Sequence, residues 1–325
     1  MLRKIGFAAL KAININKIFG SPRNFGVTVV CFHRISDEID YSYPSMPIET
    51  FRGIIKYFSQ NYSVILPDEI GKPTPKPKLI ITFDDGYKDF LSNALPILIQ
   101  YKFSAIMHVV VNTTLTGEPF WTQKISQIVN HFLKSGKYLN IKTDSLQTTY
   151  KINNSNAENI SLKIFQILSK LETKKRNLIL DELLFENDIP NSLEMMDETD
   201  LKICLKNNIM IGSHSYTHEN LSMKLSTDQL NKEIIESKNE LKKIVDRNIE
   251  CFAFPNGLTN KALTDYLIDA GYKYAFTTEN SLYTPQPYSK LNIIPRIILY
   301  GNSVNENILR MSLFQEKIKH FINGQ

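Results

Sequence analysis

The chain has 325 residues, of which 42% are hydrophobic and 22% charged, a composition typical of a globular protein with a sizeable core. Its 38 basic and 33 acidic residues give a formal net charge of +5 without an arginine-rich block, which argues against nucleic acid as a partner. The three cysteines, Cys31, Cys204 and Cys251, are odd in number and far apart. They favour buried free thiols over a disulfide framework, and therefore a reducing compartment.

Residues 1–20 predict an amphipathic helix, and residues 1–26 form the lead-in to the main domain. Two interpretations of this helix are open: it packs on the domain, or it lies on an anionic membrane surface. The sequence contains neither the roughly 20 apolar residues of a membrane span nor a clean secretion signal. We therefore expect a bacterial cytoplasmic protein, with residues 1–20 as a candidate for peripheral association with the inner membrane.

From residue 27 onward, apolar runs of strand length alternate with helical patterns. Strands are expected at 27–32, 63–66, 79–83, 104–111, 209–212, 249–254 and 272–278. Helices are expected at 48–60, from Tyr87 with a kink at Pro96, at about 227–246 and at 260–270. Repeated strand–helix units with apolar strands predict an α/β fold with parallel strands, either a barrel or a doubly wound sheet. We treat residues 27–325 as one domain.

The stretch from about 115 to 195 differs from the rest of the domain. Its helical patterns lie at 122–134, 158–170 and 174–186, around a predicted hairpin formed by YLNIK and TTYKI. We interpret this stretch as an insertion or lid between two strands.

Two adjacent carboxylates, Asp84 and Asp85, directly follow the apolar run that ends at Phe83. α/β folds place their functional sites at such strand ends. Because neighbouring side chains point in different directions, the two carboxylates can take different roles. The alternative is a turn in which Asp85 caps the helix that begins at Tyr87.

His214 and His218 follow another expected strand at a spacing of four residues. Two neutral imidazoles can converge on one metal ion, and a carboxylate would complete a three-ligand site of the catalytic type. The spacing is similar to that of the zinc-protease helix motif, but Ser215 stands where that motif has its glutamate. The alternative is a pair of surface histidines.

A third segment, FAFPNG at 252–257, is by itself only a strand followed by a turn. In combination and in this order, however, TFDDG, HSYTH and FAFPNG resemble the polysaccharide deacetylases of carbohydrate esterase family four. The resemblance covers roughly 27–112 and 197–298. It implies a distorted (β/α) barrel of about seven parallel strands and a divalent metal ion held by Asp85, His214 and His218. It also implies that Asp84 is the general base.

Two departures from the family pattern concern the catalytic groups. Ala253 stands where the family has an arginine that holds the catalytic aspartate, and we expect Arg296 to replace it; the alternative is an ordinary salt-bridging arginine. The late histidine motif is absent, but VVCFHRI resembles the early strand of circularly permuted members such as poly-N-acetylglucosamine deacetylases. His33 would then be the general acid; the alternative is a capped histidine at a strand end.

The resemblance implies hydrolysis of an acetyl group on an N-acetylated sugar, with zinc as the first choice of metal and nickel, cobalt or iron as others. Asn256, after Pro255, would support the oxyanion through its backbone N–H. A cytoplasmic location would suit a lipid- or nucleotide-linked N-acetylhexosamine. Trp121, the sole tryptophan, either stacks on the sugar or anchors the insertion. An O-acetyl esterase and an inactive sugar-binding relative are the alternatives.

Overall fold

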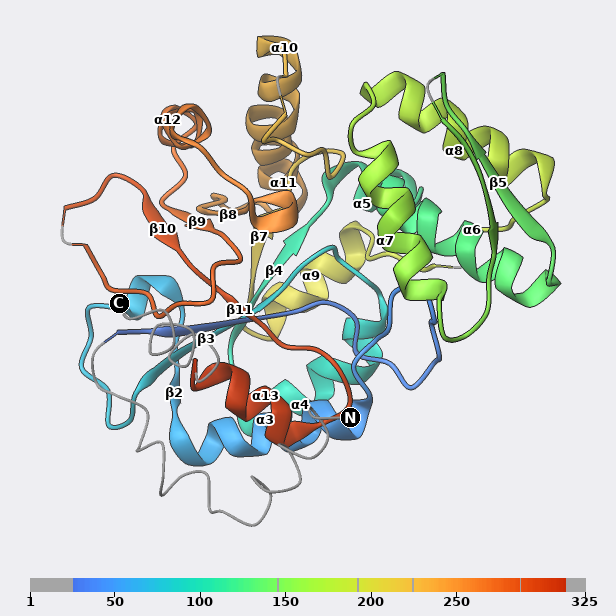
Figure 1. Ribbon diagram of the computed structural model, residues 1–325. Helices are drawn as coiled ribbons and strands as arrows, with labels where there is room; N and C mark the ends of the chain where they lie inside the picture. The colour runs from blue at the N-terminus through green and yellow to red at the C-terminus, as the bar shows by residue number, and fades with distance from the viewer. Residues whose placement is uncertain (1–25, 145, 192, 224, 287, 314–325) are drawn as a thin grey trace, which may run out of the picture.

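The computed structural model describes residues 26–313 except 145, 192, 224 and 287 (Figure 1). The amphipathic helix expected at residues 1–20 therefore lies outside the described residues. Within the described part, no helix is both long and apolar enough to cross a bilayer.

A curled parallel sheet forms the centre of the protein, and its strands lie next to one another in chain order. The successive neighbours are β1 (Thr28–Phe32), β3 (Lys78–Phe83), β4 (Ala105–Val109), β7 (Ile209–Ser213), β8 (Cys251–Ala253) and β9 (Tyr274–Phe276). A short strand, β2 (Ser63–Val64), pairs in parallel with the beginning of β3. The apolar runs expected from the sequence thus become the buried strands of one sheet.

The last two strands close the sheet. β10 (Asn292–Ile294) pairs with β9 at one edge, and β11 (Ile297–Ile298) pairs with β1 at the other. Only Pro295 and Arg296 separate them, so the two edges meet and the sheet curls into a barrel (Figure 1). With β10 and β11 sharing one position, the described strands occupy seven positions apart from β2. This confirms the expected distorted (β/α) barrel of about seven parallel strands.

Helices cover the outside of the barrel between successive strands. They are α3 (Ile48–Asn61), α4 (Leu95–Tyr101), α9 (Glu198–Lys206), α10 (Thr227–Leu230), α11 (Ser237–Val245) and α12 (Lys261–Asp269), with α13 (Val304–Met311) packed against α3. The long helix expected at 227–246 is continuous through a π-helical stretch, η3 (Asn231–Glu236).

The helical segment around Pro96, where we expect a kink, is irregular. A π-helical stretch, η2 (Phe90–Ala94), precedes α4, and Pro96 lies in the first turn of α4. The backbone is helical at Ala94 and Leu95, so η2 runs directly into α4 and Pro96 lies inside one continuous helical segment. A proline cannot donate the regular helical hydrogen bond, and both prolines and π-helical stretches are usual causes of a kink.

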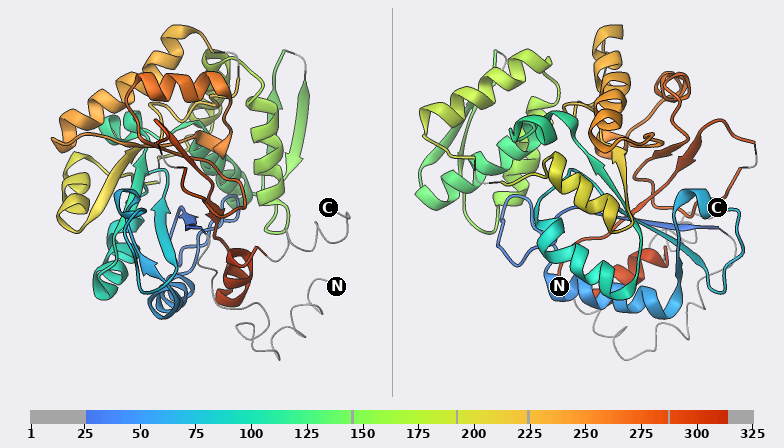
Figure 2. Two further views of the ribbon diagram at one scale, coloured as in Figure 1. Left: turned by 90° about the vertical axis from the view of Figure 1, so that its left-hand side faces the viewer. Right: turned by 180° about the vertical axis from the view of Figure 1, so that it is seen from behind.

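The insertion follows a short helix, α5 (Val111–Thr116), and lies to one side of the barrel (Figures 1 and 2). It consists of α6 (Trp121–Ser135), the antiparallel strands β5 (Tyr138–Lys142) and β6 (Gln147–Lys151), α7 (Ala157–Leu168) and α8 (Thr173–Glu186). These elements agree with the expected helices and hairpin. The insertion has a hydrophobic cluster of its own, distinct from the main cluster of the barrel.

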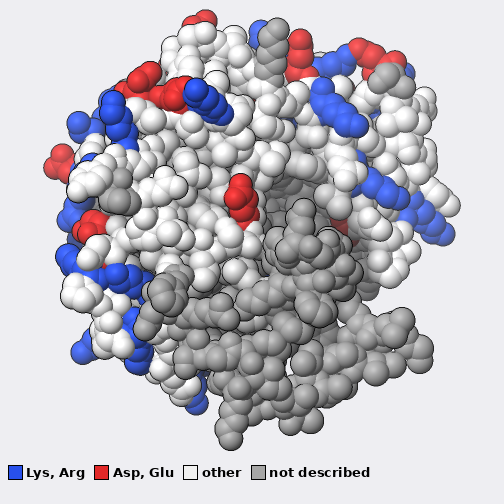
Figure 3. All heavy atoms as spheres, turned by 60° about the vertical axis from the view of Figure 1, so that its left-hand side comes forward, with Lys and Arg blue, Asp and Glu red and all other residues white. Residues whose placement is uncertain are grey.

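On one face of the protein, the charged side chains of the described residues are dispersed. On the face shown in Figure 3, Lys and Arg lie mainly towards the margins, interspersed with Asp and Glu. This distribution agrees with a small net charge spread along the chain.

Candidate metal centre and catalytic carboxylates

The candidate residues lie at the carboxyl ends of neighbouring parallel strands. Asp84 and Asp85 follow β3, His214 follows β7, and His33 follows β1. Because parallel strands end at the same side of a barrel, residues far apart in the sequence meet there.

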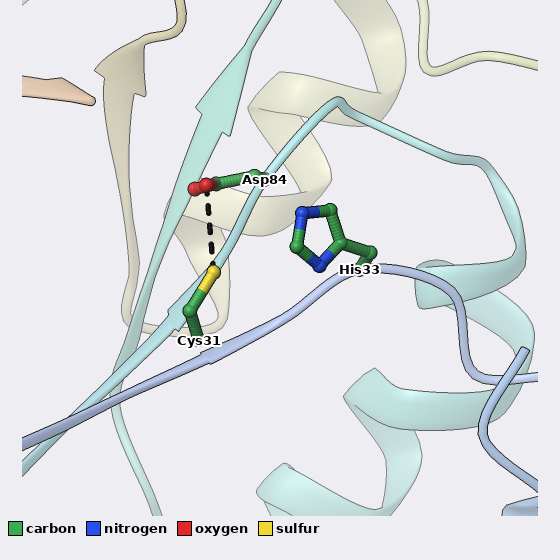
Figure 4. A group of neighbouring side chains, drawn as sticks. All are labelled: Cys31, His33 and Asp84. Carbon is green, nitrogen blue, oxygen red and sulfur yellow. Dashed lines mark hydrogen bonds between the residues drawn. The ribbon is translucent and has the colours of Figure 1, made fainter. Parts of the chain in front are cut away.

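Asp84 is the most fully hydrogen-bonded of these groups. The guanidinium of Arg296 donates to both carboxylate oxygens at 2.7 Å. Nδ1 of His108 lies 2.9 Å from Oδ1, and the thiol of Cys31 lies 3.4 Å from Oδ2 (Figure 4). Burial alone would raise the pKa of Asp84, but the charge of Arg296 and the hydrogen bonds lower it well below its usual range. Asp84 is therefore an ionised carboxylate held in one orientation.

Arg296 reaches Asp84 from the segment that closes the barrel. Its side chain is fully buried, and it also donates to the carbonyl of Thr277 at 3.1 Å and to the hydroxyl of Thr82 at 3.2 Å. Its guanidinium therefore pairs with Asp84, as expected. That it replaces the family arginine missing at Ala253 stays a prediction.

The carboxylate of Asp85 lies close to two histidines. Its φ of 77° lies in the left-handed region, which is uncommon for a residue other than glycine. Oδ1 of Asp85 lies 3.4 Å from Nε2 of His214 and 3.6 Å from Nε2 of His218. That oxygen is buried and accepts no hydrogen bond. Burial, together with the charge of Asp84, raises the pKa of Asp85 well above its usual range.

Both histidines are held as neutral imidazoles. Nδ1 of His214 lies 2.9 Å from the carbonyl of Ala253; because a carbonyl only accepts, Nδ1 carries the proton and Nε2 keeps its lone pair. Burial lowers the pKa of His214 to about 4 and that of His218 well below its usual value. Metal ions bind neutral imidazole, and a backbone carbonyl is a common partner for the second ring nitrogen.

These three residues fit a divalent metal ion. Their donor atoms lie within 4.8 Å of one another, and all three side chains are buried. A buried carboxylate oxygen without a partner, opposite two imidazole nitrogens, is costly unless a cation joins them. One carboxylate and two histidines form a three-ligand set of the type found in catalytic sites.

The loop between the two histidines owes its shape to polar contacts. Ser215 and His218 have φ values of 66° and 59°, and the hydroxyl of Ser215 accepts the N–H of His218 at 3.0 Å. The carboxylate of Glu233 accepts the N–H groups of Tyr216 and Thr217. Ser215, which stands where zinc proteases have a glutamate, therefore shapes this turn.

His33 lies beside Asp84 on the side of β1. One of its ring nitrogens, the Cys31 sulfur and an Asp84 oxygen lie within 4.8 Å of one another (Figure 4). Its ring meets that of Tyr43 edge-on at 6.0 Å. Burial lowers the pKa of His33 below its usual value, and the charge of Asp84 offsets only part of this effect. Because Arg296 already binds both oxygens of Asp84, this group does not offer a second metal site.

The turn after β8 carries the residues expected to support the oxyanion. Pro255 is buried, and Asn256 is exposed with a φ of 61°. The turn follows Ala253, whose carbonyl holds His214. The role of the Asn256 backbone N–H remains a prediction.

Trp121 lies in a different environment from the one that sugar stacking requires. The residue is only 3% exposed. Its ring stacks on Phe165 at 5.1 Å, and the guanidinium of Arg176 lies 4.4 Å from its centroid. Its Nε1 donates to the carbonyl of His218 at 2.9 Å. The structure therefore favours the anchoring interpretation of Trp121 over stacking on a sugar.

Two residues of the site were missed in the sequence. His108 lies within the apolar run SAIMHVVV and is fully buried; a single polar residue in such a run was the available signal. Gly212 lies opposite it on β7, where a Cβ would come within 2.4 Å of Cδ2 of His108. The glycine therefore makes room for the ring that holds Asp84.

Comparison with known proteins identifies the family of this chain. The family model for polysaccharide deacetylases matches residues 71–181 and 158–275, which together make up more than half of the chain. The protein belongs to the polysaccharide deacetylase family, as the motifs predicted.

Two curated relatives carry the same name. A poly-beta-1,6-N-acetyl-D-glucosamine N-deacetylase of Staphylococcus aureus (strain MRSA252) is 28% identical over 168 residues, which cover 49% of this chain and 57% of the relative. The protein of the same name from Escherichia coli (strain K12) is 29% identical over 93 residues, 26% of this chain and 14% of that protein. The chain thus spans little more than half the length of the first of these relatives.

Two solved structures share the fold. The Streptococcus pyogenes deacetylase PplD in complex with acetate is 16% identical with a TM-score of 0.58, covering 88% of this chain and 98% of its own. The IcaB structure from Ammonifex degensii is 14% identical with a TM-score of 0.57, covering 90% and 100%.

Proposed function

We propose that the protein removes acetyl groups by metal-dependent hydrolysis from an N-acetylhexosamine in a polysaccharide or in its lipid- or nucleotide-linked precursor. The observation that carries this proposal is that the two adjacent carboxylates have different partners. Asp84 is tied to Arg296, whereas Asp85 faces the neutral imidazoles of His214 and His218. The family and the names of the relatives support amide-linked acetyl groups on N-acetylglucosamine as the substrate class.

Asp85, His214 and His218 would hold one divalent metal ion, for which zinc suits the ligand set. Nickel, cobalt and iron accept the same donors. When bound, such an ion lowers the pKa of a water molecule towards about 7 and polarises an acetyl carbonyl.

The remaining residues move protons and stabilise charge. Asp84, fixed by Arg296, takes the proton of the attacking water as general base. His33 gives a proton to the nitrogen of the departing amine, which is a poor leaving group without it. The backbone N–H of Asn256 supports the negative charge that develops on the acetyl oxygen.

Metal analysis and acetate release together test this function. The purified protein should contain about one equivalent of metal and should release acetate from N-acetylglucosamine oligomers or their carrier-linked precursors. Removing the metal with a chelator should abolish release, and adding it back should restore release. Acetate from O-acetylated saccharides alone would instead define an esterase. Saccharide binding by metal-loaded protein without any acetate release would define an inactive relative.

We also propose that residues 1–20 bring the protein to the inner membrane, where carrier-linked sugars are found. The amphipathic pattern of Arg3, Lys4, Lys11 and Lys17 opposite apolar residues supports this. Co-sedimentation of the full chain with anionic vesicles, and its loss with neutral vesicles or after removal of residues 1–20, tests it.

A further inference from the structure

The beginning of the insertion contacts His218 through two consecutive residues. The ring of Phe120 stacks on the imidazole of His218 with 4.5 Å between centroids and an interplanar angle of 28°. The indole Nε1 of Trp121 donates to the backbone carbonyl of the same histidine at 2.9 Å. The insertion therefore contacts both the ring and the backbone of this candidate metal ligand.

A second contact holds the next residue along the chain. Arg176, on α8, donates to the two carboxylate oxygens of Glu219 at 2.8 and 2.7 Å. Both side chains are almost completely buried. Arg176 also covers one face of Trp121, so the two contacts form one cluster. A bidentate pair of this type fixes geometry as well as charge.

The backbone at His218 needs such support. Its φ of 59° is in the left-handed region, which is unfavourable for a residue with a Cβ. A cavity of about 470 Å³ lies where this loop meets the insertion: Thr217 and Glu219 line it from the loop, and Phe120, Trp121 and Arg176 line it from the insertion. Packing between the two is therefore incomplete, and the direct contacts of these three insertion residues connect them.

We propose that Phe120, Trp121 and Arg176 are positioning residues through which the insertion sets the orientation of His218 and hence the affinity for metal. This inference rests on the metal site of the proposed function. Residues 216 and 217 are held from the barrel side by Glu233. The N–H of His218 is held by Ser215 within the loop, whereas its ring and carbonyl are held by the insertion. The insertion would thus support the metal centre without supplying any of its three candidate ligands.

The decisive variant is Trp121→Phe. It keeps an aromatic ring beside Phe165 and Arg176 but removes the N–H that binds the carbonyl of His218. Changes in groups that orient metal ligands typically weaken metal affinity by about 10- to 100-fold. We expect a loss in this range in a competition titration against a chromophoric chelator. The titration is made at a temperature at which the metal-free variant is fully folded, because a smaller buried side chain and a lost hydrogen bond also lower its melting temperature.

Asn130→Ala is the matched control. Asn130 also connects the insertion to the barrel, since its Nδ2 donates to Asp40 at 2.8 Å, but it does not contact the His218 loop. Its replacement should leave metal affinity unchanged. If Asn130→Ala and Trp121→Phe weakened metal affinity equally, the cause would be a weaker attachment of the insertion to the barrel in general, and the inference would be overturned.

A second variant tests the other contact. Phe120→Leu keeps an apolar side chain but removes the ring that stacks on His218, and it should also weaken metal binding. Wild-type affinity in both Trp121→Phe and Phe120→Leu would overturn the inference while leaving the proposed function intact. Failure of the unaltered protein to bind metal would instead overturn the proposed function.

Discussion

The guanidinium of Arg296 and the carboxylate of Asp84 form a buried bidentate pair, with two bonds of 2.7 Å between residues 212 positions apart. The pair exists because β10 and β11 are joined by only two residues, so the chain crosses from one edge of the sheet to the other at Arg296. The segment that closes the barrel therefore also orients the proposed base.

Replacing Arg296 should reveal the cost of leaving Asp84 buried without its partner. Arg296→Met should lower the free energy of unfolding by about 3–5 kcal/mol, the usual result of breaking a buried pair from one side. Adding Asp84→Asn to that variant should recover part of the loss, because the uncompensated charge is then removed. Denaturant unfolding of the metal-free proteins measures both effects.

An exposed arginine provides the control. Arg52 pairs with Glu49 on the surface of α3, and Arg52→Met should change stability by less than about 1 kcal/mol. If Arg296→Met were no more destabilising than Arg52→Met, the buried pair would not stabilise the barrel.

Substitutions at His218 and at Asp84 should distinguish metal binding from proton transfer. His218→Ala should lose both the metal and the activity, because a candidate ligand is removed. Asp84→Asn should retain the metal while turnover falls by about a hundredfold or more, the usual scale for a general base. Metal content and kcat, measured on the same preparations, test the assignment. Full metal content in His218→Ala would contradict it.

His33→Ala should affect amides more than activated esters. The nitrogen of an amide must be protonated before it can leave, whereas an activated ester has a good leaving group. We expect a loss of about a hundredfold or more on N-acetylated sugars and a much smaller loss on an activated acetyl ester. Comparable losses on both substrates would mean that His33 binds substrate or supports the fold.

The sequence predicts those site residues whose position follows from topology. Asp84, Asp85, His214 and His33 each follow an apolar run, and parallel strands bring such ends together. Arg296 could be predicted for the related reason that a late strand must close the barrel. The fold class follows from the same alternation of strands and helices.

The residues that the sequence did not reveal depend on register and distant packing. Whether His108 points into the barrel depends on how the sheet curls, which periodicity within one apolar strand does not determine. Whether Trp121 is free to bind sugar depends on Phe165 and Arg176, which reach it from other helices of the insertion. Contacts between separate elements of this kind leave no local pattern in the chain.

Gly212 provides a test of the role of His108. An added Cβ would lie 2.4 Å from Cδ2 of His108 and 3.0 Å from Cβ of Cys251. Gly212→Ala should therefore cost about 1–3 kcal/mol of stability through overpacking. It should also lower kcat, because the displaced imidazole no longer holds the carboxylate of Asp84.

Two comparisons distinguish the clash between an added Cβ at residue 212 and His108 from the general effect of replacing a glycine by alanine. Gly71→Ala is the control, since a Cβ there meets nothing within 4 Å, and its stability and kcat should remain close to those of the unaltered protein. In the His108→Ala background the imidazole is absent, so Gly212→Ala should lose most of its destabilising effect. A full and additive cost in that background, measured by denaturant unfolding, would show that the crowding comes from Cys251 and not from His108.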